Sequence, residues 1–128
     1  MESENSEKPG LWMAESLRNV LLPYRFRFST EKELQDGIES VLVSRNISYQ
    51  REVHLGSSDR PDFMVGGIAV EVKIAGSLSA LVRQIFRYAE YRRVESILVV
   101  GSPSWIPKIV TELNGKPVCS IYLLGSLL

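Results

Sequence analysis

The sequence predicts a mixed α/β domain in which helices cover a sheet with both antiparallel and parallel strands. Residues 62–74 place apolar side chains at alternate positions around Gly66-Gly67, a pattern typical of a tight β-hairpin. Apolar residues at helical spacing precede the hairpin at 30–45 and follow it at 77–93. An apolar run at 95–101 then predicts a buried strand, which a helical crossover would place parallel to the hairpin.

The N-terminal elements follow in chain order. Residues 1–10 are acidic and polar and are expected to form a disordered lead to a single domain at 11–128. Apolar residues at 11–22 predict a short helix that Pro23 ends. Aromatic and arginine side chains alternate at 24–28, which predicts an extended segment, either a strand at the sheet edge or a surface arm. Such side chains can also stack on bases, but five residues favour the structural interpretation.

The helix at 30–45 opens with Thr30 as its N-cap and Glu33 placed to reach back to it, the arrangement of a capping box. Residues 47–55 are expected to form the first strand of an antiparallel run. His54, near the end of this strand, has no second metal-binding histidine or cysteine at a suitable spacing and is expected to be a surface residue.

The C-terminal part predicts a helix and a strand. Pro107 fits the first turn of a short helix, which Asn114-Gly115 would close, and 118–124 would form the last strand. The predicted fold is therefore an αβββαβ core with an N-terminal helix and a C-terminal helix-strand extension.

Length, charge and cysteine content limit the class of protein. The chain has 128 residues, a formal net charge of zero and one cysteine, Cys119. Zero net charge argues against a uniformly basic nucleic-acid-binding surface, although arginines gather at 77–93. One cysteine excludes an intramolecular disulfide, which fits a cytoplasmic location. The acidic start does not resemble a secretory signal, and no apolar run is long enough to span a membrane.

The hairpin carries the most informative chemistry. Counting outward from its turn, Asp62 lies opposite Glu71, and Lys73 shares their face. The opposite face is an unbroken apolar row of Phe63, Val65, Ile68, Val70, Val72 and Ile74. Two carboxylates directly opposite each other repel unless a cation lies between them or one of them is protonated. Acidic oxygen ligands suit Mg²⁺, so the pattern predicts a metal site; the alternative is an ordinary solvated sheet face.

Pro61-Asp62 and Glu71-Val72-Lys73, placed on such a hairpin, resemble the motif of the PD-(D/E)XK nuclease superfamily. The resemblance covers a little over half of the chain, since the αβββαβ core of that superfamily can be sought between about 30 and 101. It implies a divalent-metal-dependent nuclease that uses Mg²⁺, with Mn²⁺ as a substitute. It also implies that Asp62, Glu71 and the backbone carbonyl of Val72 bind the metal, while Lys73 positions water or stabilises the transition state.

Relatives in this superfamily often supply one more acid from the first helix. The helical phase places Glu31 at the border of the apolar stripe and Glu33 away from it, so the role is carried to Glu31, with Glu33 as the alternative. Several relatives also carry a Gln-x-x-x-Tyr pair in the helix after the motif, which Gln84 and Tyr88 match. The pair is expected to orient Lys73 or to contact a phosphate, whereas the alternative is structural packing.

The residues expected to contact nucleic acid are Arg60, Arg83, Arg87 and Tyr88. Asp59 could replace Asp62 by position but lies outside the hairpin register, so it ranks below Asp62. The sequence predicts a nuclease, with DNA endonuclease as the expected activity and a symmetric homodimer as the expected assembly by analogy. The alternatives are an inactive nucleic-acid-binding module and a regulatory or inhibitory protein that uses its acidic N-terminus as a contact arm.

Overall fold

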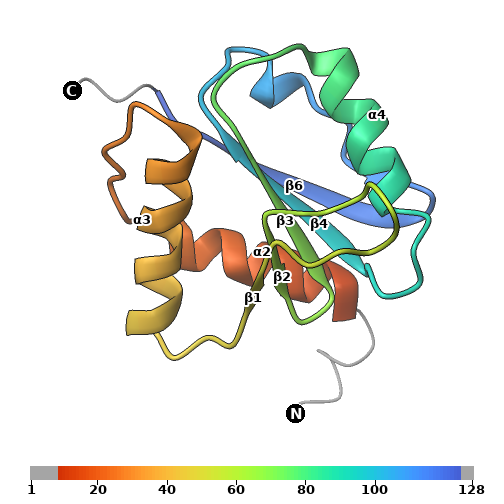
Figure 1. Ribbon diagram of the computed structural model, residues 1–128, viewed down its shortest axis with the longest axis horizontal. Coiled ribbons are helices and arrows are strands. Elements are labelled where there is room, and N and C mark those ends of the chain that lie inside the picture. The colour runs from red at the N-terminus through yellow and green to blue at the C-terminus, as the bar shows by residue number, and fades with distance from the viewer. Residues whose placement is uncertain (1–8, 125–128) are drawn as a thin grey trace.

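The computed structural model describes residues 9–124, in which three α-helices and a six-stranded mixed sheet build three layers (Figure 1). The helices are α2 (Pro9–Leu21), α3 (Glu31–Ser44), α4 (Leu78–Tyr88) and the short 3-10 helix η1 (Ile106–Lys108). The strands are β1 (Gln50–Arg51), β2 (Phe63–Val65), β3 (Ile68–Lys73), β4 (Ser96–Gly101), β5 (Glu112–Leu113) and β6 (Lys116–Tyr122). The predicted α/β class is confirmed, and α3-β1-β2-β3-α4-β4 follow in the predicted αβββαβ order.

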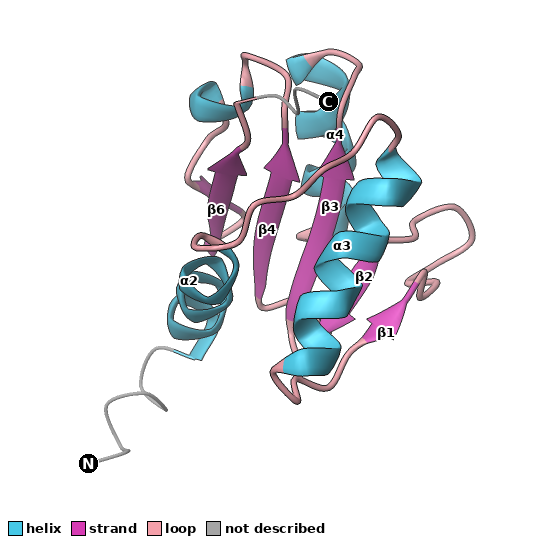
Figure 2. Ribbon diagram, turned by 90° about the vertical axis from the view of Figure 1, so that its left-hand side faces the viewer, coloured by secondary structure: helices cyan, strands magenta, loops and turns pink. Residues whose placement is uncertain are grey.

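The strands lie side by side in the order β1-β2-β3-β4-β6-β5. β2 and β3 form the predicted hairpin, with Phe63 opposite Val70 and Val65 opposite Ile68. Gly66 at its turn has a φ of 59°, which glycine adopts without a steric penalty. α4 returns the chain across the sheet, so β3 and β4 are parallel (Figure 2). β4 and β6 are also parallel, whereas β1 and β5 pair antiparallel at the two edges.

Two apolar layers, one on each face of the sheet, hold the helices in place. α2 and α3 cover one face and α4 covers the other (Figure 1). The predicted apolar row of the hairpin faces α2 and α3, where Phe63, Val65, Ile68, Val70 and Val72 are buried. On the other face, Met64 and Ala69 pack with Leu81, Ile85 and Tyr88 of α4. Burial of a large apolar side chain contributes roughly 1.5–3 kcal/mol, so both layers fix the hairpin between the helices.

Three predicted boundaries were wrong. The strand expected at 47–55 is reduced to β1, because Glu52 turns the chain with a φ of 54°. α4 ends at Tyr88 and does not continue to 93. Asn114-Gly115 joins β5 to β6 and does not close a helix, since both residues have positive φ (53° and 77°), as a tight hairpin turn requires.

The N-terminal lead was also predicted too long, since Pro9 and Gly10 belong to α2. The remainder of the predicted lead, 1–8, lies outside the described residues. Within 9–124, no helix has the length and apolar character needed to cross a bilayer.

The segment 22–30, which connects α2 to α3, has no strand structure and lies on the surface. Figure 2 shows it crossing the face of the sheet between the two helices. Phe26 and Phe28 are partly buried against the apolar layer below, and a Cβ added to Gly37 of α3 would lie 3.0 Å from the Phe26 ring. Arg25 and Arg27 alternate with them and are exposed. Of the two structures expected for this segment, a strand at the sheet edge or a surface arm, it forms the surface arm.

Candidate functional site

β3 extends beyond its partner β2, and two carboxylates occupy the edge that remains free. Asp62 immediately precedes β2, and its Oδ2 accepts a hydrogen bond of 2.7 Å from the N–H of Val72. Glu31 is the first residue of α3, and its Oε2 accepts a hydrogen bond of 3.2 Å from the N–H of Ile74. Alternate amides of a strand point to the same side and lie roughly 7 Å apart. Asp62 and Glu31 are therefore neighbours along one edge of β3.

The backbone of Val72 adds an oxygen to this edge. In a strand, the N–H and C=O of one residue point to the same side. Since the Val72 N–H points toward Asp62, its carbonyl faces the same edge. This is the oxygen that the motif implies as a metal ligand.

Glu71 and Lys73 project from the face of β3 that α4 covers. Glu71 is only 4% exposed, so the polar face of the hairpin is not the solvated surface that was the alternative. The Tyr88 hydroxyl donates a hydrogen bond of 2.8 Å to Glu71 Oε1, and Lys73 Nζ lies 3.5 Å from Glu71 Oε2. Gln84 Nε2 donates in turn to the Tyr88 hydroxyl at 3.0 Å. Gln84 and Tyr88 thus orient Glu71, whereas they were expected to orient Lys73 or to contact a phosphate.

Both hairpin carboxyls resist ionisation. Burial raises the pKa of Asp62 to about 6, and the nearby carboxylates of Glu31 and Glu52 act in the same direction. Burial, and next the charge of Asp62, raises the pKa of Glu71 to about 8, against the opposing effects of Tyr88 and Lys73. The pair therefore holds a proton near neutral pH unless a cation replaces it.

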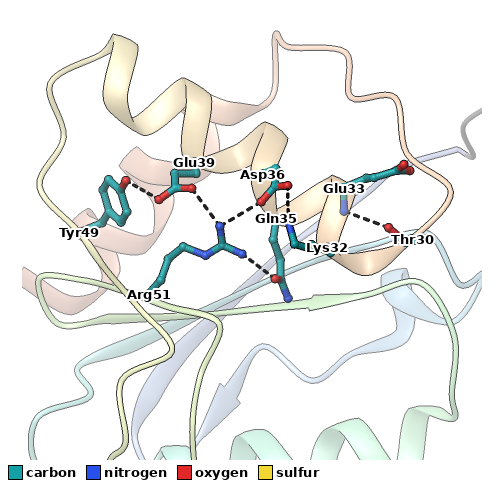
Figure 3. A network of polar contacts seen from close by, with 8 residues as sticks. All are labelled: Thr30, Lys32, Glu33, Gln35, Asp36, Glu39, Tyr49 and Arg51. Atoms are coloured by element: carbon teal, nitrogen blue, oxygen red, sulfur yellow. Dashed lines mark hydrogen bonds and ion pairs between the residues drawn. The ribbon is translucent and has the colours of Figure 1, made fainter.

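In a second polar cluster, between α3 and β1, the carboxyl pKa values are lowered and not raised (Figure 3). Arg51 Nη1 lies 3.0 Å from Asp36 Oδ1 and 2.9 Å from Glu39 Oε1. The hydrogen bond from Lys32, followed by that from Arg51, lowers the pKa of Asp36, and the hydrogen bond from Tyr49 is the main cause that lowers the pKa of Glu39. These carboxylates are already neutralised by cations and donors of the protein. Asp62 and Glu71 also have partners, but their pKa values stay raised in spite of Val72, Tyr88 and Lys73, which distinguishes them as candidate ligands.

The oxygens near the end of β3 are of the chemical type that a hard divalent cation binds. Asp62 and Glu71 supply carboxylate oxygens, Val72 supplies a carbonyl, and Glu31 could bind directly or through water; Mg²⁺ accepts a small number of such protein oxygens and retains waters for the rest. Across the described residues, no group of three or more His, Cys, Asp and Glu side chains is arranged so that it could hold a metal. The fit therefore rests on two carboxylates whose raised pKa values a cation would lower.

A clamp formed by Asp59, Arg87 and Tyr91 joins the loop that carries Asp62 to the end of α4. Asp59 is 7% exposed; its Oδ1 accepts from Arg87 Nε and its Oδ2 accepts from the Tyr91 hydroxyl, each at 2.8 Å. The hydrogen bonds from Arg87 and then Tyr91 lower the pKa of Asp59. Gly56 allows this approach, because a Cβ there would collide with the Tyr91 hydroxyl. Asp59 is thus occupied and does not replace Asp62.

The residues expected to contact nucleic acid separate into two groups. The side chains of Arg60 and Arg83 are exposed and have no hydrogen-bond or ion-pair partner within 9–124. Arg87 is half exposed but is engaged by Asp59. The expectation for Tyr88 needs correction: its side chain is fully buried and its hydroxyl is bonded to Glu71, so it belongs to the interior of the site.

The helix-borne acid next to the hairpin is Glu31. Glu33 points away and forms the cap, since its Oε1 accepts from the N–H of Ser29 at 2.7 Å and its own N–H donates to Thr30 Oγ1 at 3.1 Å. Its partner is thus Ser29, one residue before the expected cap. Sequence reasoning missed Glu52, whose carboxylate raises the pKa of Asp62, because its place opposite Asp62 follows from the pairing of β1 with β2, and no tight turn between these strands gives their register.

Comparison with protein-family models, with curated proteins and with solved structures finds no match for this chain. The fold and the site thus define a mixed α/β protein with a carboxylate-lysine cluster at the end of a β-hairpin.

Proposed function

We propose that the protein is a divalent-metal-dependent nuclease that hydrolyses phosphodiester bonds and acts as a DNA endonuclease. The observation that carries the proposal is the position of Asp62 and Glu71: two carboxyls with raised pKa values flank the end of β3, beside Lys73 and Glu31. Groups with strongly shifted pKa values that gather at one place are typical of active sites. The motif resemblance supplies the reaction class.

Asp62, Glu71, the Val72 carbonyl and Glu31 would hold Mg²⁺ or Mn²⁺. Such a cation lowers the pKa of a bound water and stabilises negative charge that develops on a phosphate. Lys73, whose side chain is 25% exposed and 3.5 Å from Glu71, can reach the same phosphate and neutralise part of that charge. Gln84 and Tyr88 hold Glu71 in place through their hydrogen bonds. Burial raises the pKa of Tyr88, so its hydroxyl stays protonated and can donate to Glu71.

Partner, assembly and location form part of the same proposal. DNA would reach the carboxylates past Arg60 and Arg83, whose exposed side chains can bind phosphates. A homodimer would place two such sites on a duplex, one for each strand. A single cysteine fits a cytoplasmic location.

The test is incubation of the full chain with supercoiled plasmid, single-stranded DNA, RNA and a four-way junction, in Mg²⁺, in Mn²⁺ and in EDTA. The proposal requires cleavage of at least one DNA substrate with metal and none in EDTA. Equal binding with and without EDTA, together with no cleavage in either metal, would instead support the inactive binding module.

A further inference from the structure

The segment 22–30 carries two arginines that the proposed site does not use. Arg25 and Arg27 are exposed, and neither side chain has an ion-pair or hydrogen-bond partner anywhere in residues 9–124. Three other arginines are engaged, Arg18 by Ser120, Arg51 by Asp36 and Glu39, and Arg87 by Asp59, whereas Arg60 and Arg83 are exposed like Arg25 and Arg27. No acidic residue occurs at 22–30. The segment is therefore a locally positive surface on a protein of zero net charge.

The segment is held in position by Phe26, which lies between the arginines, and by Phe28 and Ser29, which follow them. Phe26 and Phe28 are packed against the apolar layer under α2 and α3, and Phe26 contacts Gly37. At its end, Ser29 donates from its N–H and its hydroxyl to Glu33 Oε1, at 2.7 and 3.0 Å. A backbone fixed on both sides costs less conformational entropy on binding than a free loop would.

The segment ends at the candidate site. It leads directly into α3, whose first residue, Glu31, binds the backbone just after β3. Arg27 precedes Glu31 by four residues, which span at most about 14 Å of chain. Since the phosphates of one DNA strand repeat every 3.4 Å along the helix axis, this distance corresponds to about four nucleotides. One strand can therefore contact both places.

We propose that the segment 22–30 is a second nucleic-acid-binding surface, on which Arg25 and Arg27 bind backbone phosphates of a DNA duplex. It would lie on the α3 side of the carboxylates, whereas Arg60 and Arg83 come from the Asp62 loop and α4. The inference rests on the proposed function only in its choice of nucleic acid as the partner. Guanidinium groups suit phosphates because their planar donors match the phosphate oxygens.

The test compares Arg25→Gln/Arg27→Gln with a control that removes the same charge elsewhere, Arg45→Gln/Arg92→Gln. Arg45 follows the far end of α3, and Arg92 lies in the turn beside Glu95, whose N–H binds Gly67 at the hairpin turn. Both control arginines are exposed. Fluorescence anisotropy with a 30-base-pair duplex, in EDTA and over a NaCl series, measures binding without cleavage. Thermal unfolding of every variant checks that the fold is retained.

Two lost phosphate contacts should reduce the slope of log K against log[salt] by about 1.8, which corresponds to roughly a 60-fold loss of affinity at 0.1 M salt. The control pair should retain most of the wild-type slope. Equal slopes for the two double variants, or no duplex binding by the wild type, would overturn the inference. A wild type that binds through this segment but never cleaves would overturn the nuclease and leave this surface standing. Metal-dependent cleavage by the wild type, together with equal slopes for the two double variants, would support the nuclease and overturn the proposed binding surface.

Discussion

The Tyr88 hydroxyl lies 2.8 Å from Glu71 Oε1, although the two residues are 17 positions apart. This hydrogen bond joins the buried end of α4 to the part of β3 that extends beyond β2, and Gln84 donates to the same hydroxyl from one turn earlier. Because the donor favours the ionised carboxylate, it opposes the burial that raises the pKa of Glu71 to about 8. Tyr88 thus keeps Glu71 closer to the charged form that binds a cation.

Removing that hydroxyl should therefore impair catalysis most at neutral pH. Tyr88→Phe is expected to raise the pKa of Glu71 further and to reduce cleavage about tenfold at pH 7, with partial recovery at pH 9 as the carboxyl ionises. Tyr49→Phe is the matched control, since it removes a similar tyrosine-glutamate bond of 2.6 Å at Glu39. The measurement is a pH-rate profile for both variants. An unchanged Tyr88→Phe profile would exclude this role.

The first turn of α3 offers a pair of glutamates with different jobs. Glu31→Gln should slow cleavage and weaken metal binding, because Glu31 lies beside Asp62 at the end of β3. Glu33→Gln should lower the melting temperature and leave the cleavage rate of the folded protein unchanged, since Glu33 caps the helix through Ser29. Cleavage assays and thermal unfolding of both variants separate the two roles. The opposite assignment follows if Glu33→Gln alone stops cleavage.

The metal-free protein should become less stable as pH rises from about 5.5 to 8.5. The pKa values of Asp62 and Glu71 are raised by folding, to about 6 and about 8, so in this range the folded state binds more protons than the unfolded state. Stability therefore falls with increasing pH and levels off above the folded pKa. Urea unfolding in EDTA measures the effect, and Mg²⁺ should reduce the loss at high pH. A stability that rises over this range would contradict the assigned shifts.

The clamp at Asp59 should act on the metal site through the loop that carries Asp62. Asp59→Asn removes the ion pair with Arg87 and is expected to lower the free energy of unfolding by about 1–3 kcal/mol. It should also weaken Mn²⁺ binding in titration calorimetry, because Asp62 lies only three residues further along the chain. Arg83→Gln, one turn before Arg87 on α4, serves as the control. An unchanged Mn²⁺ affinity in Asp59→Asn would show that the clamp stabilises the fold but does not act on the metal site.

Local patterns in the sequence predicted the hairpin correctly. The turn at Gly66-Gly67 and the alternation around it determine which residues lie opposite one another, so Phe63 pairs with Val70 as expected. The ladder ends at Phe63 and Val70, so the predicted pair of Asp62 and Glu71 lies just beyond it, and the Asp62 carboxylate turns to the edge of β3, where it accepts from the Val72 N–H. Helical phase likewise distinguished the roles of Glu31 and Glu33. Both residues belong to the first turn of α3, and the buried apolar stripe of the helix determines which of them faces the sheet.

Contacts between distant segments could not be predicted in this way. The burial of Tyr88 against Glu71 and of Asp59 against Arg87 depends on how closely α4 packs on the sheet. Periodicity gives the face of a helix but not this distance. The position of Glu52 was missed for a different reason: it lies opposite Asp62 because β1 pairs with β2, and the long connection between these strands does not fix their register as a two-residue turn does.

Asp62→Asn provides the most direct test of the nuclease site, because it removes the negative charge of a candidate ligand and replaces only one oxygen of the side chain with nitrogen. Cleavage of supercoiled plasmid in Mg²⁺ should be compared for wild type, Asp62→Asn and Asp36→Asn. Asp36 is a carboxylate of the Arg51 cluster, outside the site. We expect Asp62→Asn to lose at least 100-fold in rate while it remains folded, and Asp36→Asn to cleave as the wild type does. Wild-type cleavage by a folded Asp62→Asn protein would contradict the assignment of this site.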